Sequence, residues 1–337
     1  MEERAPLTNT DDRFSKLLER HENEIRLHCY RMLGSSHDSD DMLQETLTRA
    51  FRAKETLAHE ESARAWLYRI ATNVCLDELA RRKKRLLPRE AGPPAMEPNP
   101  AIGPPEPDAY LEPCPDTWLE GTSADAGARY ELREAVALAF VAALQHLTPP
   151  QRATLLLRDV VGFSAEETSK ALALGLEATN SALFRARSAV KSKISGKEPS
   201  AFASSNRANL DALLERYLRA WNELDIDAFV ELLHDEVATT MPPAGTWIAG
   251  LAANAGFYRA MFAAQRRGSF VAVPTAANGG PAFAFYRSTA VKEPFRLRAI
   301  QLVGVRDGQI SSIDHFMLPE LATVFGLPDT LEARTFP

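Results

Sequence analysis

Residues 64–85, RAWLYRIATNVCLDELARRKKR, decide the fold of the first part of the chain. The apolar residues Trp66, Ile70 and Val74 recur at every fourth position, which is typical of an amphipathic helix packed on a core. The other face of this helix carries guanidinium, amide, carboxylate and phenol groups, from Arg64, Tyr68, Arg69, Asn73 and Asp77. The pattern therefore predicts a helix with one buried face and one polar, partly aromatic face.

Five consecutive cations end this stretch: Arg81, Arg82, Lys83, Lys84 and Arg85. One or two cations in the last turn satisfy a helix macrodipole, so the longer run indicates contact with a polyanion. Aromatic side chains that stack on bases, next to cations that neutralise phosphates, are typical of single-stranded nucleic-acid binding. Taken alone, the basic run is also consistent with a solvated helix end that only aids solubility.

Composition limits the class of protein. The chain has 337 residues, which predicts two or three domains, each able to bury its own core. Its formal net charge of -6 excludes a uniformly basic nucleic-acid coat, so polyanion binding must come from local patches. Hydrophobic residues at 45% and charged residues at 25% are typical of soluble globular proteins.

The three cysteines, Cys29, Cys75 and Cys114, are far apart and form no C-x-x-C pair. We therefore expect neither a disulfide framework nor a zinc site, and no cofactor. A reducing cytoplasm is the simplest context. No basic segment leads into an apolar one at the N-terminus, and no run approaches the roughly 20 apolar residues of a membrane span, so we expect no signal peptide and no membrane association.

A helical domain is predicted for residues 1–87. Residues 12–33 have a helical apolar pattern that Gly34 breaks, and Ser39 is the expected N-cap of the next helix. That helix has an outward face with Asp41, Gln44 and Glu45. Taken alone, such an acidic face is also consistent with simple solvation.

Two motifs in this domain resemble a known family. DSDDMLQETLTRAF at 38–51, followed by AWLYRIATNVCLD at 65–77, resembles the central region of sigma-70 initiation factors of the extracytoplasmic-function type. The resemblance implies that Asp41, Gln44 and Glu45 bind the clamp helices of the largest subunit of core RNA polymerase. It also implies that Arg64, Trp66, Tyr68, Arg69, Asn73 and the basic run contact the minus-ten promoter element and its displaced strand. An exposed acidic helix suits a basic protein partner.

Residues 88–129 form an acidic, proline-rich spacer, because proline at this density disfavours helix and sheet. Within it, Tyr110, Leu111, Trp118 and Leu119 are unusually apolar for a free linker. One interpretation is that these residues fix the spacer to a neighbouring domain. The sigma-factor resemblance implies another, in which the spacer threads the polymerase near the RNA exit path.

Residues 130–197 predict a helix-turn-helix domain. Gly162 ends one helix, Ser164 and Glu167 form a capping box for the next, and a last helix begins near residue 177. NSALFRAR at 180–187 resembles the helix with which sigma factors read the minus-thirty-five element. The expected DNA contacts on this helix are Asn180, Ser181, Phe184, Arg185, Arg187 and Lys191.

After a short linker at 198–207, residues 208–337 predict a third domain. Two amphipathic helices are followed by strands with a period of two, and Asn278-Gly279 and Asp307-Gly308 are hairpin signals. We expect a curved antiparallel sheet and an α+β cone. MPP at 241–243, Trp247 and DHF at 314–316 resemble the SnoaL-like branch of the NTF2-like superfamily. The expected fold class is thus multidomain: two all-α domains, a sigma region 2 bundle and a region 4 helix-turn-helix, followed by an NTF2-like cone.

Met241, Trp247, Asp314 and His315 are the candidate residues of a ligand pocket in this cone. Because neighbours on a strand point to opposite faces, only one of Asp314 and His315 is expected to face the interior. An acid-base pair from these two residues is therefore not expected. Docking of the cone onto other protein surfaces is favoured over ligand sensing and over catalysis.

The sequence favours an extracytoplasmic-function sigma factor that is not an enzyme. It would direct core RNA polymerase to specific promoters, assist promoter melting, and be modulated in cis by the cone through intramolecular contact. Two alternatives stay open. One is a helix-turn-helix regulator that never binds polymerase. The other is a SnoaL-like enzyme or ligand sensor that uses the helical domains as a DNA tether.

Overall fold

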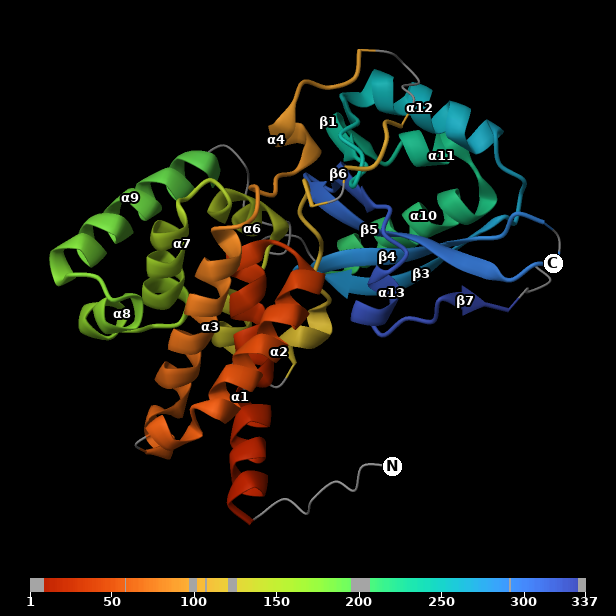
Figure 1. The fold of residues 1–337 in the computed structure, drawn as a ribbon. Coiled ribbons are helices and arrows are strands. Elements are labelled where there is room, and N and C mark those ends of the chain that lie inside the picture. Colours follow the sequence, from red (N-terminus) through yellow and green to blue (C-terminus); the bar gives the residue numbers. More distant parts are fainter. Residues whose placement is uncertain are drawn as a thin grey trace. The chain divides into compact units, whose positions relative to one another are not determined.

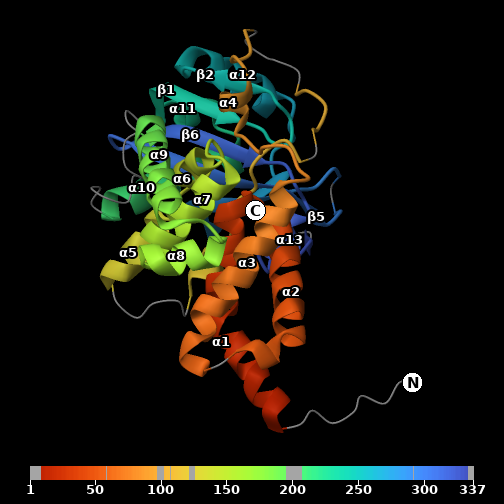
Figure 2. The ribbon, with the colours of Figure 1, turned by 60° about the vertical axis from the view of Figure 1, so that its left-hand side comes forward.

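The computed structural model describes residues 9–57, 59–96, 102–106, 108–120, 126–194, 207–290 and 292–332. The chain divides into two compact units, shown as ribbons in Figures 1 and 2. The first comprises Met1–Lys83, Thr117–Val136 and Ala143–Lys193, and the second comprises Lys84–Asp116, Ala137–Ala142 and Ile194–Pro337. In the described residues, no helix is long and apolar enough to cross a membrane.

Three long helices begin the first unit: α1 (Asn9–Leu33), α2 (Ser36–Arg52) and α3 (Ala63–Leu79). The short 3-10 turns η1 (Lys54–Thr56) and η2 (Glu60–Ser62) join α2 to α3. All three helices pack on one another through buried apolar side chains, among them Leu43 and Leu67. The helical periods predicted from the sequence are thus present.

The start of α2 differs from the expectation. Ser35 caps the helix, because its hydroxyl accepts a hydrogen bond of 3.1 Å from the backbone N–H of Asp38. The prediction that Ser39 caps it is wrong. Gly34 takes a positive φ of 73°, so the chain turns sharply enough for the helix to begin at Ser36.

The first unit also contains the shorter elements α5 (Ala126–Glu134), α7 (Pro149–Leu155), the π-turn η4 (Leu156–Val160), α8 (Ala165–Leu172) and α9 (Leu176–Ile194). Most of α6 (Leu138–Leu144) belongs to the second unit. Gly162 has a φ of 86° and follows the π-turn. The capping box of Ser164 and Glu167 at α8 is confirmed. Helices α8 and α9 form the predicted helix-turn-helix.

The proline-rich spacer is divided between the two units. In the first, Trp118 of η3 (Asp116–Leu119) is buried against Tyr30 in a T-shaped contact with centroids 6.2 Å apart. The guanidinium of Arg26 lies 5.5 Å from the centre of the same indole. In the second unit, Tyr110 and Leu111 are buried. These side chains fix the spacer to the folded units, as the first interpretation of its apolar residues predicts.

The second unit contains a seven-stranded sheet with the strand order β2-β1-β6-β5-β4-β3, and β7 pairs with β5. The strands are β1 (Leu233–Thr240), β2 (Trp247–Ala249), β3 (Phe270–Ala277), β4 (Gly280–Arg287), β5 (Phe295–Arg306), β6 (Gln309–Phe316) and β7 (Thr330–Leu331). Its helices are α4 (Pro88–Ala91), α10 (Arg207–Glu223), α11 (Ile226–Val230), α12 (Leu251–Ala263) and α13 (Leu321–Val324). Here β1 pairs with β6 in parallel, so the expectation of a fully antiparallel sheet is wrong.

Both predicted hairpin turns are present. Asn278 and Gly279 have φ angles of 54° and 76°, and Asp307 and Gly308 have 53° and 77°. Two successive positive φ angles are the requirement of a type I′ turn, which Asn-Gly and Asp-Gly satisfy at low cost. The parallel pair arises because β1 and β6 are far apart in the chain, so no hairpin fixes their relative direction.

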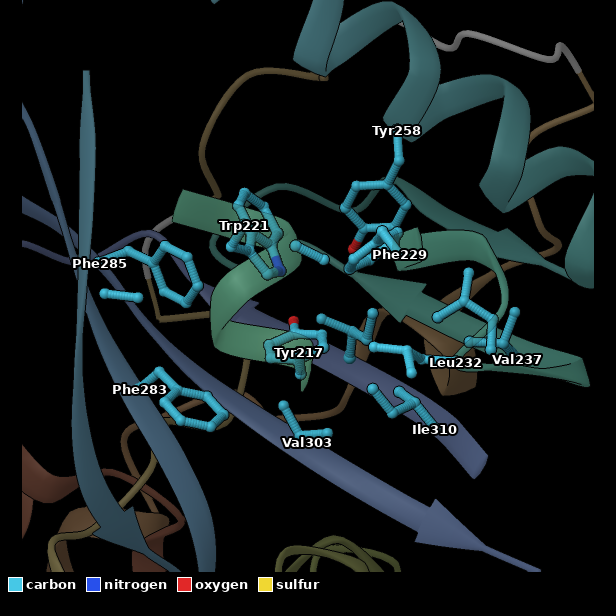
Figure 3. Packing of buried hydrophobic residues seen from close by; sticks show 14 of the residues in the cluster. Tyr217, Trp221, Phe229, Leu232, Val237, Tyr258, Phe283, Phe285, Val303 and Ile310 are labelled. Carbon is cyan, nitrogen blue, oxygen red and sulfur yellow. The ribbon is translucent and has the colours of Figure 1, made fainter. Parts of the chain in front are cut away.

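Aromatic side chains fill the space between the sheet and helices α10 to α12 (Figure 3). Trp221 of α10 lies at the centre, with its ring centroid 4.6 Å from that of Phe285 and 5.8 Å from that of Phe229. Each buried aromatic contact of this kind adds about 0.5 to 1.5 kcal/mol beyond the area that it buries. The chain therefore has the predicted class of fold, helical domains followed by an α+β sheet domain.

Candidate nucleic-acid and polymerase interfaces

The acidic face of α2 is open to a partner. Asp41 and Gln44 are exposed, and within the described residues neither side chain makes a hydrogen bond. Glu45 is half-exposed and accepts a hydrogen bond of 2.7 Å from Arg49, which also contacts Asp77 at 3.2 Å. The three predicted polymerase contacts thus share one helix face, with two of them unengaged.

On α3 the predicted DNA contacts separate into exposed and covered groups. Arg69 and Asn73 are exposed and four residues apart, so they lie on the same side of the helix. Trp66 is buried instead, with its indole N–H donating to Thr56 at 3.2 Å and its ring packed on Phe14. Its position in the apolar stripe, and not its aromatic character, determines where it lies.

Tyr68 was expected on the outward face, but it is only 3% exposed. Its hydroxyl donates to Glu24 at 3.2 Å, and its ring packs edge-on against Phe163, with centroids 5.6 Å apart. Burial raises the pKa of Tyr68 well above its usual value. The expectation of an outward ring is wrong for this structure because the segment before α8 covers the ring.

Arg64 also contacts Tyr68 and Glu24. Its guanidinium lies 5.2 Å from the centre of the Tyr68 ring, donates to Glu24 at 2.9 Å, and donates to the carbonyl oxygen of Val161 at 3.4 Å. Three side chains that could stack on bases or neutralise phosphates therefore contact one another in this conformation: Arg64, Tyr68 and Phe163. Sequence reasoning missed Phe163, and the only signal was an apolar residue next to a helix-ending glycine.

The basic run is divided in the same way. Arg81, Arg82, Lys83 and Lys84 are exposed, although Arg82 forms ion pairs with Asp38 and Glu78. Arg85 is 5% exposed and belongs to the second unit, where it donates to the carbonyl of Tyr110 at 3.2 Å and to Asp108 at 2.9 Å. The expectation that all five cations face a phosphate backbone does not hold for Arg85. Asp108 neutralises the charge of this residue.

The outward face of α9 matches its predicted composition. All six expected DNA contacts are exposed, and Phe184 retains 74% of its accessible surface; the six are Asn180, Ser181, Phe184, Arg185, Arg187 and Lys191. Leu183 and Ala186 are buried on the inner face. A helix with a packed inner face and a polar outer face of this width fits a major groove.

Arg187 has an acidic partner that sequence reasoning missed. Its guanidinium forms two hydrogen bonds with Asp159, at 2.7 Å and 2.8 Å. These bonds raise the pKa of Arg187. Asp159 lies in the π-turn after α7, a local helix distortion that the sequence does not indicate. Any use of Arg187 on DNA must therefore compete with this ion pair.

In the second unit, the four candidate pocket residues do not form one site. Met241 lies in the aromatic core. The indole N–H of Trp247 donates to the carbonyl of Gly92 at 2.9 Å. Asp314 accepts a hydrogen bond of 2.7 Å from Thr240 and lies 3.7 Å from the guanidinium of Arg89. Asp314 and Trp247 thus contact residues of the proline-rich spacer, and the structure does not bring the four residues together.

His315 faces the opposite side of β6 from Asp314, as strand alternation requires. Its ring is partly buried and contacts the hydroxyl of Tyr258 at 2.9 Å and the amide of Gln301 at 2.9 Å. Burial lowers the pKa of His315 to about 3. The ring is therefore neutral near pH 7, and the centroids of Trp221, Tyr258 and Phe285 lie within 6.4 Å of it.

Comparison with known proteins identifies the families to which the parts of this chain are similar. The sigma-70 region 2 model matches residues 17–85, the sigma-70 region 4 model matches residues 137–190, and the SnoaL-like domain model matches residues 214–313. The ECF RNA polymerase sigma factor SigG of Mycobacterium tuberculosis is 39% identical over 332 residues, which cover 97% of this chain and 87% of that protein. The chain belongs to the ECF sigma factors.

Two further relatives of this ECF sigma factor are informative. SigE of Mycolicibacterium smegmatis is 29% identical over 178 residues, covering 52% of this chain and 58% of that protein. The crystal structure of the ECF sigma factor SigJ of Mycobacterium tuberculosis superposes with a TM-score of 0.58 at 21% identity, covering 94% of this chain and all of that one. The latter likeness shows that helical domains followed by a sheet domain are a shared fold.

Proposed function

We propose that this ECF sigma factor binds core RNA polymerase through Asp41, Gln44 and Glu45 and directs it to specific promoters. The exposed α9 face would read the minus-thirty-five element in the major groove. Arg69, Asn73 and the exposed cations of the basic run would hold the displaced strand near the minus-ten element. The observation that carries this proposal is that α2, α3 and α9 each present an exposed polar face of the composition its partner requires.

We further propose that the SnoaL-like domain modulates this activity in cis by holding the segment that connects the two promoter-binding regions. Residues 84–116 belong to the sheet unit. The backbone N–H of Glu106 donates to Pro243 at 2.8 Å, Cys114 and Asn278 exchange two hydrogen bonds, and the backbone N–H of Gly279 donates to Asp116 at 2.8 Å. A free segment of this length would span up to roughly 110 Å, whereas these hydrogen bonds hold described residues of the segment on the sheet unit.

This proposal assigns no catalytic role and no cofactor to the SnoaL-like domain. A general base must reach its substrate in a state that accepts a proton, and a tunable pKa near the working pH serves it best. Aromatic rings pack against the partly buried His315 on one face of β6, and Asp314 accepts a hydrogen bond from Thr240 on the other. Polymerase and promoter DNA are the proposed partners, and the cytoplasm, where they are found, is the proposed location.

Run-off transcription with purified core polymerase tests both proposals when the full chain is compared with a chain that ends at Ser200. We expect both proteins to support initiation, with different activities. If neither protein initiates at any promoter, the polymerase-directing role is wrong. If both proteins have the same activity and the same affinity for polymerase, the modulatory role of the SnoaL-like domain is wrong and the directing role stands.

A further inference from the structure

A small groove lies where β4 ends and β5 begins in the SnoaL-like domain. Its volume is about 350 Å³, and it is lined by Arg287, Thr289, Glu293, Pro294, Arg296 and Arg298. None of these residues belongs to the proposed polymerase or promoter interfaces. Three arginines and one carboxylate give this groove an excess of positive charge.

Strand register brings the arginines together. Arg287 of β4 is the direct partner of Arg296 of β5. Arg298 is the extra residue of the bulge between the pairs Phe285 with Ala299 and Tyr286 with Leu297, and both Arg296 and Arg298 are exposed. Like charges directly opposite on neighbouring strands are destabilising, and bulges often re-aim a side chain. Repulsion between the paired residues Arg287 and Arg296 therefore reduces the stability of the folded chain.

These arginines have no acidic ion-pair partner among the residues that the structure describes. In the part of the chain that the structure describes, none of the three guanidiniums has a carboxylate within 4.0 Å. Arg287 lies over the Phe270 ring at 5.8 Å, and its Nε is buried without a hydrogen-bond partner. Glu293 accepts a hydrogen bond of 2.5 Å from Thr289 instead of pairing with an arginine. A buried N–H donor without an acceptor is costly, and an acceptor supplied by a ligand would offset that cost.

We propose that this groove binds a small phosphate-bearing molecule. Guanidinium groups bind phosphate oxygens through paired hydrogen bonds. The net charge of the lining, three arginines against Glu293, balances a phosphate monoester, which carries about -1.5 to -2 at pH 7. The groove is also near the lower limit of small-molecule sites, which begins at about 300 Å³. A nucleic-acid backbone requires a longer basic track than this short groove provides.

Isothermal titration of the full chain with inorganic phosphate and with pyrophosphate, at constant ionic strength in a chloride buffer, tests the proposal. We expect one site per chain and a rise in melting temperature on saturation. The double variant Arg296→Gln with Arg298→Gln should weaken binding at least tenfold, and Arg298→Gln alone should weaken it less. Arg219→Gln, which removes an exposed arginine from α10, should bind as the parent chain does.

Three results would overturn the proposal. The first is the absence of phosphate and pyrophosphate binding by the parent chain. The second is binding that the double variant retains or that Arg219→Gln weakens to the same extent, since either result indicates general charge screening. The third is a double variant that loses affinity for promoter DNA while its phosphate affinity is unchanged, which would assign the groove to the nucleic-acid backbone.

Discussion

The ring of Tyr68 on α3 is covered by the ring of Phe163, which precedes α8, with the two planes inclined at 75°. Tyr68 is one of the residues that the sigma-factor resemblance assigns to unpaired bases. In this conformation its ring contacts region 4 of the same chain, so base stacking on Tyr68 requires residues 161–163 to leave. The structure therefore represents a state in which part of the proposed DNA-binding face of region 2 is occupied by region 4.

Phe163→Ala should increase the affinity of the free chain for single-stranded DNA several-fold, because it removes the ring that covers Tyr68. Fluorescence anisotropy with a labelled oligonucleotide, measured without polymerase, provides the test. The matched control is Leu183→Ala, which truncates a side chain of equal burial on the inner face of α9. Equal affinities for the parent and the Phe163→Ala chain, or an equal gain in the Leu183→Ala chain, would contradict the covering role.

Replacement of Arg185 or Arg187 by alanine should weaken promoter binding by the holoenzyme by about 1 to 3 kcal/mol each. Arg185 has no acidic partner among the described residues, whereas Arg187 must first leave Asp159. Asp159→Asn should therefore strengthen promoter binding, because it removes the competitor of the phosphate or base. Gel-shift titration over a range of salt concentrations is the measurement. Unchanged affinity in both alanine variants would remove α9 arginines from the interface.

His315 makes the free energy of unfolding depend on pH. Its pKa is lowered to about 3 in the folded chain, against about 6.5 in an unfolded one. Between these values the unfolded chain binds a proton that the folded chain does not. This residue therefore lowers the free energy of unfolding by about 1.4 kcal/mol for each pH unit below pH 6.5.

The variant His315→Gln should consequently lose less stability than the parent chain between pH 6.5 and pH 5, by about 2 kcal/mol. Urea unfolding of the sheet unit, followed by hydrogen exchange of its strands, measures the difference. His234→Gln is the control for removing a histidine from the same unit. A His315→Gln chain as sensitive to acid as its parent would show that the ring is protonated, or accessible, in the folded state.

Trp247→Ala should loosen residues 84–116 from the sheet, because the indole N–H holds Gly92 and the backbone of Trp247 accepts a hydrogen bond from Ala95. Hydrogen exchange of residues 86–96 should accelerate, and promoter-dependent activity should shift toward that of the chain ending at Ser200. Met261→Ala, which truncates a partly buried side chain packed on the aromatic core, is the control. If hydrogen exchange accelerates while promoter-dependent activity is unchanged, the attachment of residues 84–116 to the sheet does not regulate transcription.

Local patterns predicted most elements of this fold. The apolar period placed Ile70 and Val74 on α3, the Ser164 and Glu167 pair located the start of α8, and the Asn-Gly and Asp-Gly pairs located two hairpins. Each of these features depends on residues close in the chain. The parallel pairing of β1 with β6 depends on residues roughly seventy positions apart, and no local rule sets its direction.

The site residues also divide into those whose position follows from local sequence and those whose position depends on distant residues. Exposure of Asn180 or Arg185 follows from the helical period, and the structure has both exposed. The covering of Tyr68 by Phe163, the pairing of Arg187 with Asp159, and the burial of Arg85 beside Asp108 each join residues from different elements. Such long-range pairs are decided by tertiary packing, so a single sequence carries little signal for them.

Run-off transcription from fragmented DNA of the source genome, with homologous core polymerase and with or without the full chain, is the most direct test of promoter-directing activity. We expect transcripts with defined 5′ ends that appear only when the chain is present, and that are reduced when Asp41→Arg replaces the exposed acid of α2. The absence of any chain-dependent transcript would contradict the assignment of promoter-directing activity to this protein.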